Sequence, residues 1–154
     1  MTSRADCHSI WKIETCVADH LGLLRRMLLS AELPAEDLTA GKLGDFLVAE
    51  DEDSNVGGMV GLEKAGDSGL LRSLVVDPAA RNLGLGSLLV AAIEDRARQA
   101  GIGRLYLLTN TAERYFPTLG YCPIERSDAP HGIQQTEEFR DLCPDSAVCM
   151  VKML

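Results

Sequence analysis

Arg81-Asn82-Leu83-Gly84-Leu85-Gly86-Ser87 joins two segments of different periodicity. The apolar run at residues 70–76, closed by Asp77-Pro78, predicts a strand, and residues 88–98 have the spacing of a helix. Two glycines at this junction would let an anion approach the backbone without meeting a Cβ. Free N–H groups and the helix dipole favour phosphate or pyrophosphate at the start of the helix. The sequence therefore predicts an anion site between strand and helix.

Two common phosphate motifs do not fit this stretch. A dinucleotide fingerprint needs a third glycine where Leu89 stands, and a P-loop needs Lys where Ser87 follows Gly86. What remains is Arg/Gln-x-x-Gly-x-Gly/Ala after a strand that ends in Val-x-Pro. This pattern resembles the acyl-CoA signature of the GCN5-related N-acetyltransferase superfamily. The resemblance implies that the loop amides hold the pyrophosphate of coenzyme A and that the preceding strand pairs with its pantetheine arm.

A second stretch, residues 110–121, resembles motif B of the same superfamily, Asn-x-x-Ala-x-x-(Phe)-Tyr-x-x-x-Gly-Phe. The resemblance covers residues 10–151 and is sharpest at residues 70–121. Three shorter runs, at residues 69–76, 112–121 and 138–147, resemble the arsenic-resistance N-acetyltransferase subgroup. That subgroup is close to acetyltransferases that inactivate phosphinothricin-type amino acids.

Length and composition restrict the class of protein. A chain of 154 residues with 46% hydrophobic and 25% charged residues predicts one soluble globular domain over residues 1–154. The net charge of −8 argues against nucleic-acid and anionic-membrane partners, which require a basic surface. The N-terminus has no apolar segment typical of a secretory signal, and no apolar run reaches membrane-spanning length.

Cysteine and histidine spacing gives no metal motif. The cysteines are odd in number and lack a Cys-x-x-Cys pair, so reduced thiols in a cytoplasm are expected: Cys7, Cys16, Cys122, Cys143 and Cys149. The histidines His8, His20 and His131 are scattered, and no metal is expected. The oligomeric state stays open, with a homodimer as one alternative.

The order of predicted elements indicates the fold class. Strands are expected at residues 10–14, 46–50, 56–63, 70–76, 105–108, 121–125 and 147–151. Helices are expected from Val17 to before Leu33, from Gly84 to Gly101, at residues 111–119 and at 133–142, with a turn or short helix at 36–39. Antiparallel hairpins followed by strand–helix–strand predict an α/β (α+β) protein with a mixed central sheet flanked by helices. This agrees with the acetyltransferase fold.

The cofactor site is predicted from the two motifs. The amides of Leu83, Gly84, Leu85, Gly86 and Ser87 would hold the pyrophosphate, with Arg81 and Asn82 at the mouth and Arg81 as a charge-assisted donor. The resemblance implies that the backbone of Leu74, Val75 and Val76 binds pantetheine and that the Val76 amide polarises the acetyl carbonyl. It also implies cofactor contacts from the second motif, at Asn110, Ala112 and Tyr115.

The general base and acid are less clear. The positions that carry a Glu or His base in much of the family hold Leu70 and Arg72. Arg72 stays protonated, so we expect it to bind a carboxylate of the acceptor. The alternative is that Arg72 pairs with an acidic side chain across the sheet. Glu63 is the best spare carboxylate for a water-mediated base, the alternative being a solvated hairpin end. The place of the usual tyrosine acid holds Phe116, which leaves the acid open.

These residues predict an acetyl-CoA-dependent N-acetyltransferase that acts on the amine of a small, amino-acid-like acceptor. The subgroup resemblance implies a role in resistance to arsenicals or antimetabolites. A non-catalytic acyl-CoA-binding module is the alternative, because the usual base and acid are missing. A third alternative is a metalloid-binding thiol protein that uses Cys122, Cys143 and Cys149.

Overall fold

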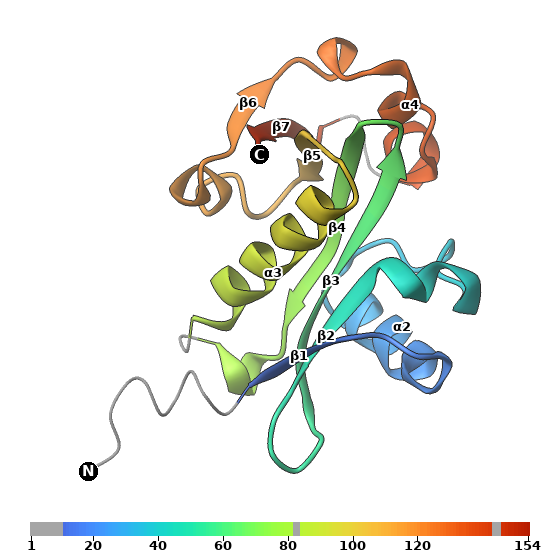
Figure 1. Ribbon diagram of the computed structural model, residues 1–154, viewed down its shortest axis with the longest axis vertical. Coiled ribbons are helices and arrows are strands. Elements are labelled where there is room, and N and C mark those ends of the chain that lie inside the picture. The colour runs from blue at the N-terminus through green and yellow to red at the C-terminus, as the bar shows by residue number, and fades with distance from the viewer. Residues whose placement is uncertain (1–10, 82–83, 143–145) are drawn as a thin grey trace. The chain divides into compact units, whose positions relative to one another are not determined.

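The computed structural model describes residues 11–81, 84–142 and 146–154. At Leu142 it describes the backbone but not the side chain. Seven strands form one mixed sheet in the order β1-β2-β3-β4-β5-β7-β6, and helices flank it (Figure 1). This confirms the predicted fold class. The chain forms two compact units, one built from residues up to Gly61 with Ser73–Ile93, the other from Leu62–Arg72 with Glu94–Leu154. That the whole chain is one domain stays a prediction.

The first unit holds the first antiparallel strands of the chain and the first helices. Its elements are β1 (Lys12–Thr15), η1 (Ala18–His20), α2 (Leu21–Ser30), η2 (Ala40–Asp45), β2 (Phe46–Glu50), the first part of β3 (Val56–Ala65), the end of β4 (Ser68–Val76), η3 (Pro78–Ala80) and the start of α3 (Leu85–Gln99). In the sheet, Lys12 lies opposite Glu50, and Phe46 lies opposite Gly61. β2 has the predicted bounds, and the predicted first helix is divided between η1 and α2.

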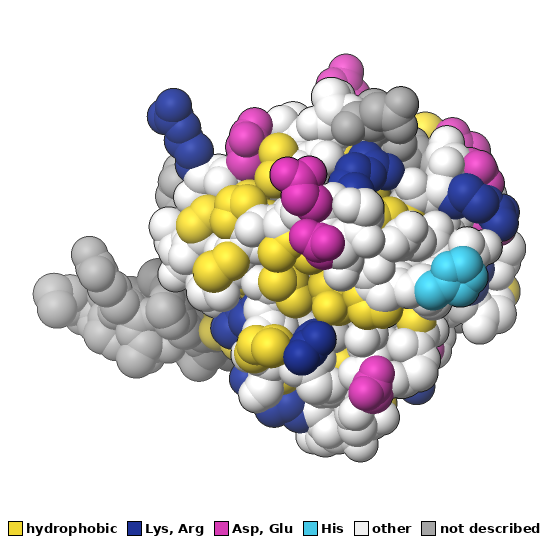
Figure 2. Space-filling view, turned by 90° about the horizontal axis from the view of Figure 1, so that it is seen from above, with side chains coloured by type: hydrophobic (Ala, Val, Ile, Leu, Met, Phe, Trp, Pro, Cys, Tyr) yellow, Lys and Arg dark blue, Asp and Glu magenta, His cyan; other side chains and the backbone are white. Residues whose placement is uncertain are grey.

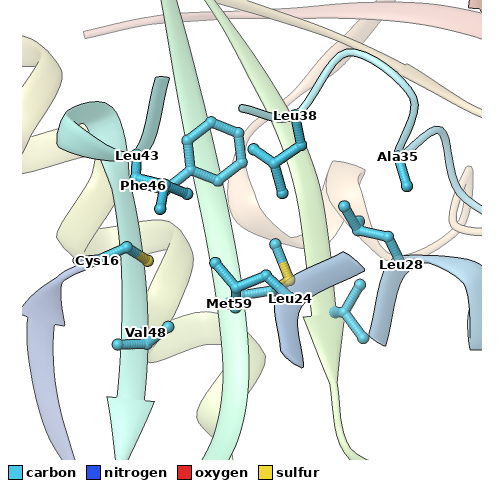
Figure 3. Close-up of a cluster of buried hydrophobic side chains, with 10 residues drawn as sticks. Cys16, Leu24, Leu28, Ala35, Leu38, Leu43, Phe46, Val48 and Met59 are labelled. Atoms are coloured by element: carbon cyan, nitrogen blue, oxygen red, sulfur yellow. The ribbon is translucent and has the colours of Figure 1, made fainter. Parts of the chain in front are cut away.

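The core of this unit lies between α2 and strands β2 and β3 (Figure 3). Leu24 and Leu28 recur one helical turn apart, so both are buried on one face of α2. They share the core with Phe46 and Met59, which are fully buried. A Cβ added at Gly61 would lie 2.4 Å from the Phe46 ring. The glycine is therefore needed for the ring to lie against the backbone of β3.

The second unit contains the rest of the sheet. Its further elements are β5 (Arg104–Thr109), η4 (Phe116–Leu119), β6 (Cys122–Ile124), η5 (Arg126–Asp128), α4 (His131–Gln134), the π-helix η6 (Glu138–Leu142) and β7 (Val148–Met153). β4 and β5 pair in parallel over three residue pairs, Ser68–Arg104 to Leu70–Tyr106. β7 pairs antiparallel with both β5 and β6. A separate core forms around Leu70, Tyr106, Ile133 and Phe139.

Two predicted helices in the second unit are wrong. The one expected at residues 133–142 is broken because the Thr136 hydroxyl donates to Ile133 O (2.7 Å) and accepts from Phe139 N (3.4 Å). The one expected at residues 111–119 is a turn followed by η4, since Pro117 lacks the N–H that a longer helix needs there. The predicted glycine ends are confirmed, because Gly101 and Gly120 have φ of 81° and 98°.

Strand β4 contains one irregular residue. Ser73 has a φ of 60°, in the left-handed region that costs an L-residue roughly 1–2 kcal/mol. Six consecutive residues up to Ser73 are buried, and only after it do buried and half-buried residues alternate. Simple strand alternation therefore fails to predict side-chain directions across this point.

The surface carries mixed charge. Figure 2 shows one face of the molecule, on which acidic and basic side chains are interspersed with apolar ones. Among the helices of the described residues, none is both long and apolar enough to span a bilayer.

Candidate functional site

The end of β4 presents backbone groups along one edge. Asp77 N–H donates to Gly57 O on β3 at 2.8 Å. Because successive residues of a strand turn their N–H and C=O to opposite edges, those of Val76 and Leu74 face away from β3. Arg81 Nε donates to Val76 O at 3.3 Å, which agrees with this direction. Val76 thus offers a donor and an acceptor where the resemblance predicts the pantetheine contacts.

The turn after β4 is fixed by its own hydrogen bonds. The Asp77 carboxylate accepts from Ala79 N at 2.9 Å, and Asp77 O accepts from Ala80 N at 2.8 Å. Ala80 is buried, which anchors the turn in the unit. Arg81 leaves this turn at the surface. The predicted cofactor residues Asn82 and Leu83 lie outside the described residues.

The glycine loop ends at the start of α3. Gly84 has a φ of 75°, which its lack of a Cβ permits, and α3 begins at Leu85. Leu85 is buried and anchors the first turn, whereas Ser87 is exposed. Gly84 O accepts from Leu88 N at 3.2 Å, which closes the first turn of the helix. That the amides of this loop hold a phosphate stays a prediction.

Close packing holds α3 against the sheet. A Cβ added at Gly58 would lie 2.8 Å from Leu89 Cδ1 and 3.0 Å from Val75 O. Gly58 therefore lets α3 approach β3 closely, which fixes the start of the helix relative to the end of β4. The sequence did not predict this role for Gly58, because a glycine within a strand can be explained in many ways.

A cavity of about 450 Å³ opens beside the end of β4. Arg26 and Met27 of α2 line it together with Val75 and Val76 of β4 and with Arg81. Its walls are mainly aliphatic, and the two guanidinium groups of Arg26 and Arg81 outnumber the one carboxylate, Asp77, that also lines it. The cavity is thus suited to a small ligand that carries negative charge.

A second cavity in the first unit has the opposite charge. It measures about 620 Å³, and Trp11, Asp51 and Asp77 are among the residues that line it. The Asp51 carboxylate accepts from Asn55 N and Asp53 N, and the hydrogen bond from Asn55 N contributes most to lowering its pKa below the ordinary value. Because Asp51 stays anionic, this cavity does not suit a phosphate or a carboxylate.

The predicted catalytic pair Arg72 and Glu63 lies in the second unit. The Arg72 side chain is fully buried, and its Nη1 donates to Glu63 Oε1 at 2.5 Å. Its Nε also lies 3.6 Å from Oε1 of the buried Glu138. Arg72 therefore does not need a substrate carboxylate to balance its charge, since two protein carboxylates neutralise it. That Arg72 binds the acceptor stays a prediction. The alternative prediction, an acid across the sheet, matches this geometry.

The second motif is also in the second unit. Asn110 is exposed just after β5, and Ala112 N–H donates to Thr109 Oγ1 at 3.0 Å. The half-buried Tyr115 ring packs edge-on against Phe116 with centroids 5.4 Å apart. Phe116 is buried, as expected for a core aromatic. The cofactor roles of Asn110, Ala112 and Tyr115 stay predictions.

A buried polar cluster was missed from sequence. Tyr121 Oη donates to Glu94 Oε2 at 2.9 Å, and Lys152 Nζ lies 3.0 and 3.1 Å from the two Glu94 oxygens. Burial, with the nearby Glu94 carboxylate, raises the pKa of Tyr121, so its hydroxyl stays protonated and donates. Because these three residues are far apart in sequence, no local pattern indicated the contact.

We expect Tyr121→Phe to lower the free energy of unfolding by about 1.5–3 kcal/mol, because it removes a buried hydrogen bond to a charged acceptor. Chemical denaturation measures the change. The control is the same substitution in a Glu94→Gln background, where the charged acceptor is gone and the loss should be smaller. Equal losses in both backgrounds would show that the hydrogen bond to the carboxylate does not stabilise the fold.

The thiol cluster predicted for a metalloid stays a prediction, because one of its three cysteines is not described. Cys16 and Cys149 are buried, and burial raises the pKa of their thiols to about 12 and about 11. Cys122 is exposed, and Cys143 lies outside the described residues. Within residues 11–81, 84–142 and 146–154, no group of three or more His, Cys, Asp or Glu side chains could hold a metal ion.

Comparison with known proteins gives a family match. The sequence model of the acetyltransferase (GNAT) family matches residues 15–121. An amino-acid acetyltransferase of Pseudomonas putida is 38% identical over 65 residues, which make up 41% of this chain and 15% of that protein. The chain therefore spans only a small part of the curated relatives that it matches.

Solved structures share the fold. N-acetylglutamate synthase from Neisseria gonorrhoeae, complexed with coenzyme A and N-acetyl-glutamate, superposes with a TM-score of 0.79 and 23% identity, over 94% of this chain and 35% of that one. A GNAT-family acetyltransferase from Staphylococcus aureus Mu50 gives a TM-score of 0.74 and 19% identity, over 94% and 99% of the two chains. At such identities, the likeness shows the fold alone.

Proposed function

Because the chain belongs to the acetyltransferase (GNAT) family, we propose that it transfers the acetyl group of acetyl-CoA to the amine of a small, amino-acid-like acceptor. The observation that carries this proposal is the edge of β4, where Val76 offers its N–H and C=O beside an arginine-lined cavity. The turn and the start of α3 follow directly in the chain. The name of the Pseudomonas putida relative supports an amino acid as the acceptor.

In this proposal, pantetheine pairs with the free edge of β4 and the phosphates lie at the first turn of α3. Arg81 now donates to Val76 O at 3.3 Å, which is a long hydrogen bond. A ligand amide that binds Val76 O would displace Arg81, whose guanidinium would then be available to a phosphate. Binding at one end of the cofactor would thus release a donor for the other end.

The proposed reaction is direct attack of a neutral amine on the acetyl thioester. The Val76 N–H donates to the carbonyl oxygen as negative charge develops on it. A C–N bond forms, the C–S bond breaks, and the thiolate leaves with the electron pair. The amine proton passes to a base, for which we propose Glu63, and Arg72 holds the Glu63 carboxylate in place.

We expect Glu63→Gln to lower kcat by about 10²–10⁴-fold, the usual contribution of a positioned general base. The amide keeps an oxygen for Arg72, which preserves the local hydrogen bond. Release of free CoA across a panel of amino acids, polyamines, aminoglycosides and arsenical and phosphinic analogues is the assay. Glu14→Gln, on β1 at a partly exposed ion pair with Lys12, is the matched control.

Unchanged kcat in Glu63→Gln would remove Glu63 from catalysis. Binding of acetyl-CoA by the wild type without CoA release for any acceptor would instead support the non-catalytic acyl-CoA-binding module. The panel also tests the proposed role in arsenical resistance, which rests on the sequence resemblance alone. The reduced Cys16, Cys122 and Cys149 support a cytoplasmic location as part of the proposal.

A further inference from the structure

We propose that Arg26 is the residue that recognises the acceptor's carboxylate, and that the acceptor is therefore an α-amino acid with a free carboxylate. The inference rests on the proposed function and assigns substrate specificity to a residue that the sequence did not indicate. Arg26 lies on α2 and lines the cavity that Val76 also lines. A carboxylate bound to Arg26 would thus lie in the cavity that also borders the proposed acetyl site at Val76.

The guanidinium of Arg26 is available to a ligand, whereas three other arginines already have partners within the protein. Its chain neighbour Arg25 donates to Leu38 O at 2.6 Å, and Arg81 donates to Val76 O. Arg72 is held by two carboxylates. Over the described part of the chain, Arg26 has no hydrogen-bond or ion-pair partner. Its guanidinium can therefore bind an external anion without breaking an internal contact.

The local geometry gives the guanidinium room. A Cβ built at Gly22, one turn earlier on α2, would lie 3.7 Å from Arg26 Nη1. The guanidinium thus extends back along the helix over a position without a side chain. A planar guanidinium binds a carboxylate through two parallel hydrogen bonds, which a point charge such as lysine does not reproduce.

The surroundings strengthen such a contact. Met27, Val75 and Pro78 line the cavity with aliphatic groups beside the exposed Arg26, so a carboxylate bound there would lose part of its contact with water. The acidic cavity beside Asp51 would repel the same carboxylate. A neutral amide in place of the carboxylate would lose the charge-assisted pair but keep the amine contact.

The test compares α-amino acids with their carboxamides, in equilibrium binding with CoA present and in CoA release from acetyl-CoA. We expect Arg26→Gln to weaken binding and lower kcat/KM for the amino acids about 10- to 100-fold, the range for a hydrogen-bonded charge pair. The carboxamides should change little. Arg26→Lys should recover only part of the loss. Arg104→Gln, an exposed arginine at the start of β5, should match the wild type.

Each outcome decides the inference. Equal losses for acids and amides in Arg26→Gln, or no loss for either, would overturn it. Failure of every amino acid to bind the wild type would also overturn it, even if other amines are acetylated and the proposed function stands. Selective, Arg26-dependent binding of amino acids without CoA release would uphold the inference and reject the proposed transfer reaction.

Discussion

Arg72→Ala is expected to lower the free energy of unfolding by about 3–5 kcal/mol, the cost of removing one partner of a buried ion pair. The substitution leaves Glu63 and the buried Glu138 without the cation that neutralises both. Two carboxylates from β3 and η6 would then repel each other within the second unit. Glu138 begins the π-helix, so we expect this segment to loosen first.

Denaturant unfolding monitored by circular dichroism measures the loss, with Arg104→Ala as the exposed control. Arg72→Lys keeps the charge but not the planar fork, and should lie between the wild type and Arg72→Ala. The same variants separate the two predicted roles of Arg72. Unchanged stability, with a fall in kcat/KM confined to carboxylate-bearing acceptors, would restore Arg72 as the substrate-binding residue and contradict the structural role.

Gly86→Val is expected to abolish the stabilisation that acetyl-CoA gives to the wild type. By linkage, a ligand that binds only the folded state at a hundred times its Kd adds about 2.7 kcal/mol. Gly86 lies in the first turn of α3, where a branched side chain would occupy the space that the pyrophosphate needs. Valine has the better helix propensity, so the unliganded fold should not be weakened.

Thermal unfolding with and without acetyl-CoA is the measurement. Gly44→Ala is the control, because a Cβ at Gly44 would meet nothing within 4 Å. That variant should keep the full shift in Tm. A normal shift in Gly86→Val would remove the loop from the cofactor site, and with it the reason for placing phosphate at α3.

The sequence predicted the elements around the site because local signals determine them. An apolar run closed by Asp77-Pro78, then glycines, then a 3.6-residue period define β4, the loop and α3 without any tertiary information. The prediction of a helix over 133–142 was wrong because hydrophobic periodicity contains no information on side-chain hydrogen bonds. The Thr136 hydroxyl binds the backbone and ends α4 early.

Side-chain partners were harder to predict than elements. The role of Arg72 was inferred from the position that carries a base in much of the family, and the positive φ of Ser73 interrupts the strand at the next residue. Its partner Glu138 is 66 positions away, and no spacing rule connects them. Arg26 lies on a helix, where an arginine carries no sequence signal of a binding role. Its importance depends on the cavity, which forms from segments about 50 residues apart.

The strand order has a consequence for synthesis on the ribosome. β7 is translated after β5 and β6, yet it lies between them and pairs with both. Until Val148–Met153 has emerged, the nascent chain exposes one edge of β5 and leaves β6 without its partner. Unpaired strand edges are sites of aggregation, so a message truncated before codon 148 should yield insoluble product. Translation of β7 thus controls when the second unit can fold.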